Sequence, residues 1–243
     1  MRYALEEGVF LQKRGQNASI IVMFDVISIG TATRDVYLIS PHFKVVKDKK
    51  HLEKMGFPSG EATCFALGSK VEVADIFFTT GGGAVNAAST FARQGLRTGA
   101  LVTLGNDAHG SAVVQELKRE RVSVLPVIRK GSRTAYSTLL LDKGGERTIL
   151  SYRQSEDNLR LRDIPFGKLK ARWVYVATGT IDLPTLHGLV KRLHKAKIKI
   201  AINPSRHTIA FGKKKLAQLF EQVNTVIMNR EEASILTGIP YEQ

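Results

Sequence analysis

Three consecutive glycines followed by an asparagine form the part of the sequence best suited to binding chemistry, in the stretch TTGGGAVNAASTFARQG at Thr79–Gly95. Gly81–Gly83 precede a predicted helix at 84–94, whose first backbone N–H groups have no partner within the helix. Asn86 carries both a hydrogen-bond donor and an acceptor, as a hydroxyl group does. The pattern is typical either of a tight turn into a helix or of a loop that binds a polyhydroxylated small molecule.

The two common nucleotide-binding glycine motifs do not fit this stretch. In a dinucleotide-binding motif Asn86 would replace the third glycine, and no acidic residue follows about twenty positions later. No glycine precedes a Lys-Ser or Lys-Thr pair at the spacing of a P-loop.

The elements around the glycine cluster alternate between strand-like and helix-like periodicity, which predicts an α/β fold with a mostly parallel sheet. Two excursions, near 36–80 and 134–152, break the alternation and predict a small β element beside the main sheet. Residues 1–22 have weak periodicity and are expected to form a weakly structured extension, so that the folded domain covers 23–243 and Met23 is an alternative start to Met1. Predicted strands cover 24–30, 97–105, 122–128, 172–179, 198–204 and 225–229, and predicted helices cover 84–94, 111–121, 184–193, 214–223 and 230–236.

The composition limits the classes of function. A net charge of +14 is compatible with nucleic-acid binding, but the basic residues are dispersed and lack interleaved aromatic residues, so nucleic acid is not the expected partner. The single cysteine, Cys64, excludes an internal disulfide, and no apolar run approaches the roughly 20 residues needed to span a membrane. The sequence therefore predicts a cytoplasmic protein without a membrane segment.

Several motifs in chain order resemble those of the PfkB, or ribokinase-like, carbohydrate kinases. The glycine cluster resembles the first family signature, and SIGTATRDVYL resembles the family's first strand and loop. GSRTAYSTLLLDKGGERTILSY resembles the lid hairpin, while AINPS and MNREEASILTG resemble later elements of the family. The resemblance implies a three-layer α/β/α fold with a small β lid, and transfer of the ATP γ-phosphoryl group, with Mg²⁺, to a hydroxyl of a sugar, nucleoside or related molecule.

The resemblance also implies roles for individual residues. Asp35 would accept hydrogen bonds from substrate hydroxyls, Gly82 and Gly83 would present backbone to the substrate, and Asn86 would contribute its side chain. Family members often have lysine at the position of Gly83, which leaves the type of sugar open.

Asn229 and Glu232 would organise Mg²⁺ and the phosphates through water, with no direct metal ligand. From the residues alone, the same pair is equally well explained as a helix N-cap and its capping-box partner. Asn203 and Thr134 are weaker correspondences.

The family's catalytic aspartate lies in a Gly-Ala-Gly-Asp stretch, and no such stretch occurs in these 243 residues. We therefore expect a C-terminally incomplete kinase domain that does not turn over ATP by itself, whether as a fragment, an incomplete gene model or half of a split enzyme. The rival hypotheses are a non-catalytic sugar- or nucleoside-binding module and, with less support, a basic nucleic-acid-binding protein. The lid region also suggests a homodimer.

Overall fold

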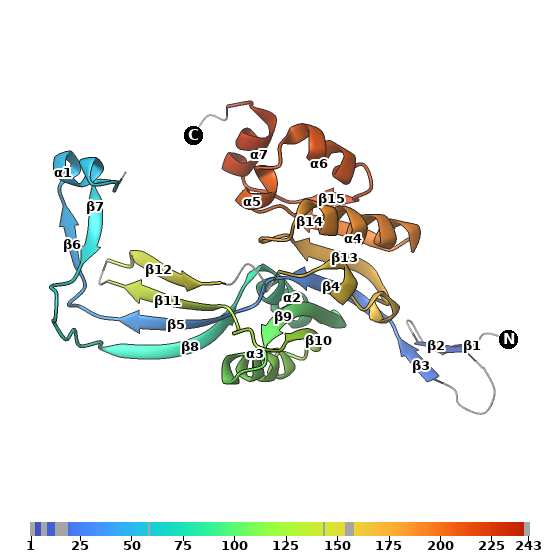
Figure 1. The fold of residues 1–243 in the computed structure, drawn as a ribbon. Coiled ribbons are helices and arrows are strands. Elements are labelled where there is room, and N and C mark those ends of the chain that lie inside the picture. Colours follow the sequence, from blue (N-terminus) through green and yellow to red (C-terminus); the bar gives the residue numbers. More distant parts are fainter. Residues whose placement is uncertain are drawn as a thin grey trace. The chain divides into compact units, whose positions relative to one another are not determined.

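The computed structural model describes residues 3–5, 9–12, 19–57, 59–142, 144–153 and 158–240. The chain divides into two compact units (Figure 1). Unit 1 comprises Met1–Ala32, Gly81–Thr134 and Gln154–Gln243, and unit 2 comprises Thr33–Thr80 and Ala135–Arg153. The two excursions that the sequence predicts, near 36–80 and 134–152, overlap the two segments of unit 2.

Unit 1 is built on a six-stranded sheet in the order β10-β9-β4-β13-β14-β15, in which every neighbouring pair is parallel. A parallel sheet needs covering on both faces, which explains the nearly continuous burial along its central strands. The strands are β4 (Phe24–Gly30), β9 (Thr98–Gly105), β10 (Ser123–Arg129), β13 (Ala171–Ala177), β14 (Lys199–Asn203) and β15 (Thr225–Val226).

Helices cover both faces of this sheet. Successive residues of a strand point to opposite faces, so neighbouring residues of one strand contact helices on opposite sides. Leu101 of β9 belongs to an apolar cluster with α4 and α6, whereas the flanking Ala100 and Val102 belong to a second cluster with α2 and α3. The predicted three-layer α/β/α arrangement is thus confirmed. The helices are α2 (Gly83–Arg93), α3 (Ala108–Arg119), α4 (Leu183–Lys195), α5 (Arg206–Ile209), α6 (Lys213–Phe220) and α7 (Arg230–Thr237), with 3-10 turns η2 (Leu161–Asp163) and η3 (Phe166–Lys168).

The helix ends follow from local sequence signals. Asp182 accepts a hydrogen bond from the Thr185 backbone N–H at 2.7 Å and caps the start of α4. Gly238 ends α7 at φ 74°, in the left-handed conformation that glycine adopts most easily. The predicted strand at 225–229 was too long, since β15 stops at Val226 and Asn229 already caps α7. No described helix has the length and apolar content that crossing a membrane requires.

Unit 2 contains a four-stranded sheet in the order β12-β11-β5-β8. β11 pairs antiparallel with β12, as the predicted hairpin requires, and parallel with β5. β6 and β7 form a separate antiparallel pair, and the short helix α1 lies between them in the chain. The elements are β5 (Thr33–Ile39), β6 (Lys44–Lys47), α1 (Lys49–Lys54), β7 (Glu61–Cys64), β8 (Asp75–Gly81), β11 (Tyr136–Leu141) and β12 (Arg147–Tyr152).

The range 1–22 contains three short strands that the weak periodicity did not predict. β1 (Tyr3–Leu5), β2 (Val9–Gln12) and β3 (Ser19–Val22) pair antiparallel in chain order and form a sheet of their own.

Candidate functional site

The candidate site in unit 1 lies at the edge of the sheet where the parallel strands end, the usual place for ligands in open α/β sheets. β4 and β13 approach each other closely there. Gly30, the last residue of β4, has φ 150°, and a Cβ atom on it would lie 2.2 Å from the carbonyl oxygen of Ala177. Gly179 has φ 51°, and its added Cβ would lie 2.7 Å from Thr31 Cγ2. These contacts leave no room for side chains at either glycine.

The glycine cluster forms the start of α2 and packs against the residue that follows β4. Gly82 is the N-cap at φ 97°, where a Cβ atom would lie 2.5 Å from the Thr31 carbonyl oxygen. A Cβ atom on Gly83 would lie 2.8 Å from Ala177 Cβ, and its backbone N–H donates to Thr31 Oγ1 at 3.2 Å. The glycines therefore allow a helix N-terminus to approach the ends of two strands.

The first turn of α2 presents polar groups suited to a ligand. The N-cap residue, Gly82, has no side chain to cap the helix, and the Thr31 hydroxyl accepts from the first helical N–H, that of Gly83. Asn86 lies one turn into the helix and is exposed. Its backbone carbonyl accepts from Thr90 Oγ1 at 2.8 Å, whereas its side-chain amide has no hydrogen-bond partner among the described residues. The structure thus places Gly82, Gly83 and Asn86 together.

Asp35 belongs to unit 2 and lies within β5, where it pairs in register with Ser137 of β11. The loop position suggested by the sequence was therefore wrong, because parallel pairing with β11 extends the strand through Asp35. Its Oδ1 atom is buried and has no hydrogen-bond partner among the described residues. A buried carboxylate oxygen without a donor is costly, so this atom is suited to a ligand that supplies one.

Asn229 and Glu232 form a capping box at the start of α7. Asn229 Oδ1 accepts from the Glu232 backbone N–H at 2.7 Å, and Glu232 Oε2 accepts from the Asn229 backbone N–H at 3.0 Å. The capping explanation left open by the sequence is confirmed. Glu232 Oε1 has no partner among the described residues, so one carboxylate oxygen stays available to a hydrated cation.

The two weaker sequence correspondences have structural explanations. Asn203 Nδ2 donates to the Ile227 carbonyl oxygen at 2.7 Å and holds the end of β14 to the segment after β15. Buried Thr134 donates to Asp107 through its backbone N–H at 2.8 Å and through its hydroxyl at 2.7 Å. Asp107 also caps α3 by accepting from the Gly110 backbone N–H at 2.7 Å.

Two features near this edge were missed by the sequence interpretation. Thr178 Oγ1 accepts from the Ser205 backbone N–H at 2.8 Å and from the Thr208 hydroxyl at 2.7 Å, which fixes the loops after β13 and β14. Arg129 forms an ion pair with Asp163. Ser205 is the last residue of the AINPS motif, so the motif could have indicated the first feature. Nothing in the sequence pattern pairs Arg129 with Asp163, which is 34 residues away.

Asp107 provides a prediction about stability in acid. Burial alone would raise the pKa of its carboxyl group, but hydrogen bonds from Thr134 and Gly110 hold that pKa below the ordinary value of 3.8. A carboxyl whose pKa is lowered by folding contributes stability above its unfolded pKa, and that contribution is lost as the pH falls below about 4. We expect Asp107→Asn to lower the free energy of unfolding by about 1–3 kcal/mol at pH 7, because the new amide faces the Thr134 donor.

Urea unfolding at pH 7 and pH 3 tests this prediction, with exposed Glu53→Gln as the control for loss of a carboxylate. The difference in the free energy of unfolding between wild type and Asp107→Asn should be smaller at pH 3 than at pH 7. An equal difference at both pH values would show that the charge of Asp107 does not contribute to stability.

Among the described residues, no group of three or more His, Cys, Asp or Glu side chains could hold a metal ion.

Comparison with solved structures places the fold among the ribokinase-like α/β kinases. The chain is similar to a carbohydrate kinase from Agrobacterium tumefaciens (19% identity, TM-score 0.68, covering 89% of this chain and 64% of that one). It is also similar to Arabidopsis thaliana ribokinase complexed with ribose and ATP (18% identity, TM-score 0.65, covering 91% of this chain and 65% of that one). A third similar structure is the nucleoside kinase of Methanocaldococcus jannaschii (16% identity, TM-score 0.60, covering 90% of this chain and 66% of that one). The chain thus spans about two thirds of the length of these structures.

The family itself is established by a match to the pfkB family of carbohydrate kinases over residues 23–243. The chain belongs to this family.

Proposed function

We propose that this chain binds a polyhydroxylated small molecule, a sugar or nucleoside, as the phosphoryl acceptor of an ATP-dependent kinase. The observation that carries the proposal is the start of α2, where Gly82 and Gly83 let the helix N-terminus pack against the ends of β4 and β13. The side-chain amide of Asn86, one turn further, has no hydrogen-bond partner among the described residues. Family membership supports the reaction class.

The proposed binding residues have complementary hydrogen-bonding roles. Asp35 is an acceptor whose buried Oδ1 has no donor within the described part of the chain, and a substrate hydroxyl would supply one. Asn86 both donates and accepts, so it suits a hydroxyl group of a ligand. Gly82 and Gly83 lack side chains and let the start of α2 pack closely against Thr31 and Ala177. A hydrocarbon or a simple anion would leave this set of groups only partly used.

ATP and Mg²⁺ fit the family, and ATP would supply the phosphoryl group while Mg²⁺ offsets its negative charge. Of the residues present, Glu232 with its free Oε1 and Asn229 at the start of α7 are proposed to orient water molecules around the cation. We assign no residue of this chain as the catalytic base. Mg²⁺-dependent nucleotide binding that is unchanged in Glu232→Gln would contradict the role of Glu232.

Calorimetric titration of the chain with ribose, fructose and adenosine, each beside a deoxy analogue, tests the proposed function. We expect saturable binding of one polyol per chain, weakened at least tenfold when a recognised hydroxyl is removed, because a buried acceptor then loses its donor. Polyol binding without phosphoryl transfer from ATP would favour the alternative of a non-catalytic binding module. Binding of none of the polyols would contradict both.

We also propose a homodimer formed through the sheet of unit 2. Ile76, Phe78 and Leu150 are large apolar side chains with about half of their surface exposed. Phe78 contacts Arg34, and the strand register places Leu150 on the same face of the sheet as Arg34, so an apolar area lies on that face.

Analytical ultracentrifugation tests the dimer. The wild-type chain should sediment as a dimer at micromolar concentration, and Leu150→Asp should shift it to a monomer. Substituting exposed Leu96 of unit 1 by Asp is the matched control and should leave the dimer intact. A monomeric wild-type chain would contradict the proposal.

A further inference from the structure

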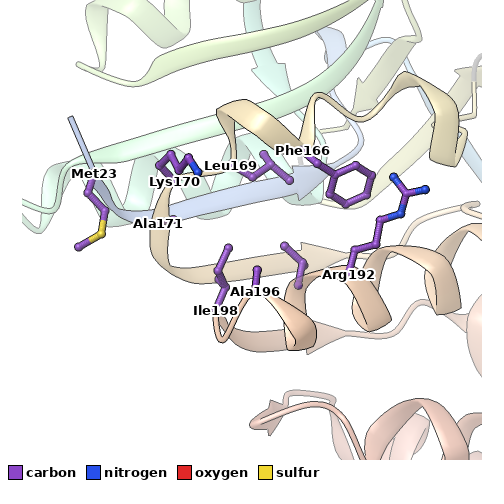
Figure 2. A pocket seen from close by; sticks show the side chains of 9 residues that line it. Met23, Phe166, Leu169, Lys170, Ala171, Arg192, Ala196 and Ile198 are labelled. Carbon is purple, nitrogen blue, oxygen red and sulfur yellow. The ribbon is translucent and has the colours of Figure 1, made fainter. Parts of the chain in front are cut away.

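Unit 1 contains a cavity of about 360 Å³ at the end of the sheet opposite the candidate site. It lies where β13 begins and α4 ends, and Figure 2 shows the side chains that line it. β13 runs for 7 residues from Ala171, in the cavity wall, to Ala177 beside the glycine cluster. At roughly 3.3 Å per residue the two places are about 20 Å apart. The lining residues are Met23, Phe166, Leu169, Lys170, Ala171, Arg192, Leu193, Ala196 and Ile198.

The cavity combines an apolar lining with two cationic side chains. Leu169, Ala171 and Leu193 are buried parts of the main core, so the cavity has a fixed hydrophobic base. Lys170 and Arg192 are exposed, and none of the described residues that line the cavity is acidic. Among the described residues, neither cation forms an ion pair.

The side chain of Arg192 stacks on the aromatic ring of Phe166. Its guanidinium lies over the ring of Phe166, 4.5 Å from the ring centre, and Figure 2 shows the two side chains together at one end of the cavity. Stacking uses the flat face of the guanidinium and leaves the N–H groups at its edge free to bind a carboxylate or phosphate. The pair thus positions a donor group beside an apolar surface.

We propose that this cavity is a binding site for a small anionic amphiphile, a carboxylate attached to a compact hydrocarbon body. The anion is held by Arg192 and Lys170, and the hydrocarbon covers Leu169, Leu193 and Phe166. The volume lies in the range of ordinary small-molecule sites, and a polyol would leave the apolar base without a partner. The site is therefore distinct from the proposed substrate site in both position and chemistry.

Octanoate and its neutral isostere octanamide are the probes, titrated into the full chain by calorimetry. We expect one octanoate per chain with a Kd of roughly 1 mM or lower. Octanamide should bind at least tenfold more weakly, because it lacks the charge that Arg192 and Lys170 recognise. Arg192→Gln and Lys170→Gln should each weaken octanoate at least threefold, and Ala196→Trp should abolish binding of both probes by filling the cavity.

Lys191→Gln is the matched control, since it removes a positive charge from the same helix at a residue outside the cavity lining. It should change octanoate affinity less than 1.5-fold. All four substituted side chains are exposed, and a thermal melt of each variant verifies folding. The proposal is overturned if octanoate does not bind, if octanamide binds equally well, if Lys191→Gln weakens binding as much as Arg192→Gln, or if Ala196→Trp has no effect.

Discussion

Gly30→Ala is expected to lower the free energy of unfolding by about 3 kcal/mol or more, the largest stability effect of any single methyl group added to the strands of unit 1. Gly30 ends β4 at φ 150°, and the added Cβ would lie 2.2 Å from the Ala177 carbonyl oxygen. No flexible side chain is available to yield, since the contact is with the backbone of β13. The strand ends must therefore separate.

Gly131→Ala is the matched control for this prediction. Gly131 also has positive φ, 80°, but no described residue has an atom within 4 Å of its added Cβ. Gly131→Ala should lower the free energy of unfolding by only about 1 kcal/mol, through backbone strain. Chemical denaturation of both variants separates the cost of backbone strain from the cost of steric overlap at the added Cβ. Equal losses in the free energy of unfolding would mean that the close approach of β4 to β13 is not as described.

Asp35→Asn is expected to weaken polyol binding by about 100-fold, the largest functional effect of any single substitution considered. Asp35 Oδ1 is buried and no described residue donates to it, and hydrogen bonds to a charged acceptor are worth about 1.5–3 kcal/mol. The amide also brings a donor to a position that needs an acceptor. Asn86→Ala should weaken binding by a smaller factor of about tenfold, since a neutral amide is lost from an exposed position.

Each of these variants has a control on the same unit. Glu53→Gln removes a carboxylate from exposed α1, and Gln94→Ala removes an amide from the far end of α2. Neither should change the Kd measured by calorimetry. If Asp35→Asn binds the polyol as tightly as the wild type, Asp35 is a residue of β5 with no role in recognition.

Much of the fold was predictable because local periodicity decides it. The stripe of Leu186, Leu189, Val190 and Leu193 predicts a helix with one buried face, and all four are fully or almost fully buried. The capping box of Asn229 with Glu232 likewise needs only neighbours three residues apart. Such signals do not depend on distant parts of the chain.

The site was only partly predictable, since its contacts join distant segments. The sequence indicated that Gly82 and Gly83 leave space for a ligand, whereas the structure shows both packed against Thr31 and Ala177. Asp35 was expected in a loop. Its strand, β5, was missed because the partner strand that stabilises it, β11, lies about a hundred residues further along the chain. Pairing over such distances leaves no local pattern.

The central claim is that the buried Oδ1 atom of Asp35 accepts a hydrogen bond from a hydroxyl of a polyhydroxylated ligand. A crystal structure of the chain with whichever sugar or nucleoside binds in calorimetry tests it most directly. The claim predicts density for a ligand that has a hydroxyl within 2.5–3.2 Å of the Asp35 carboxylate. A bound ligand that makes no contact with this carboxylate would contradict it.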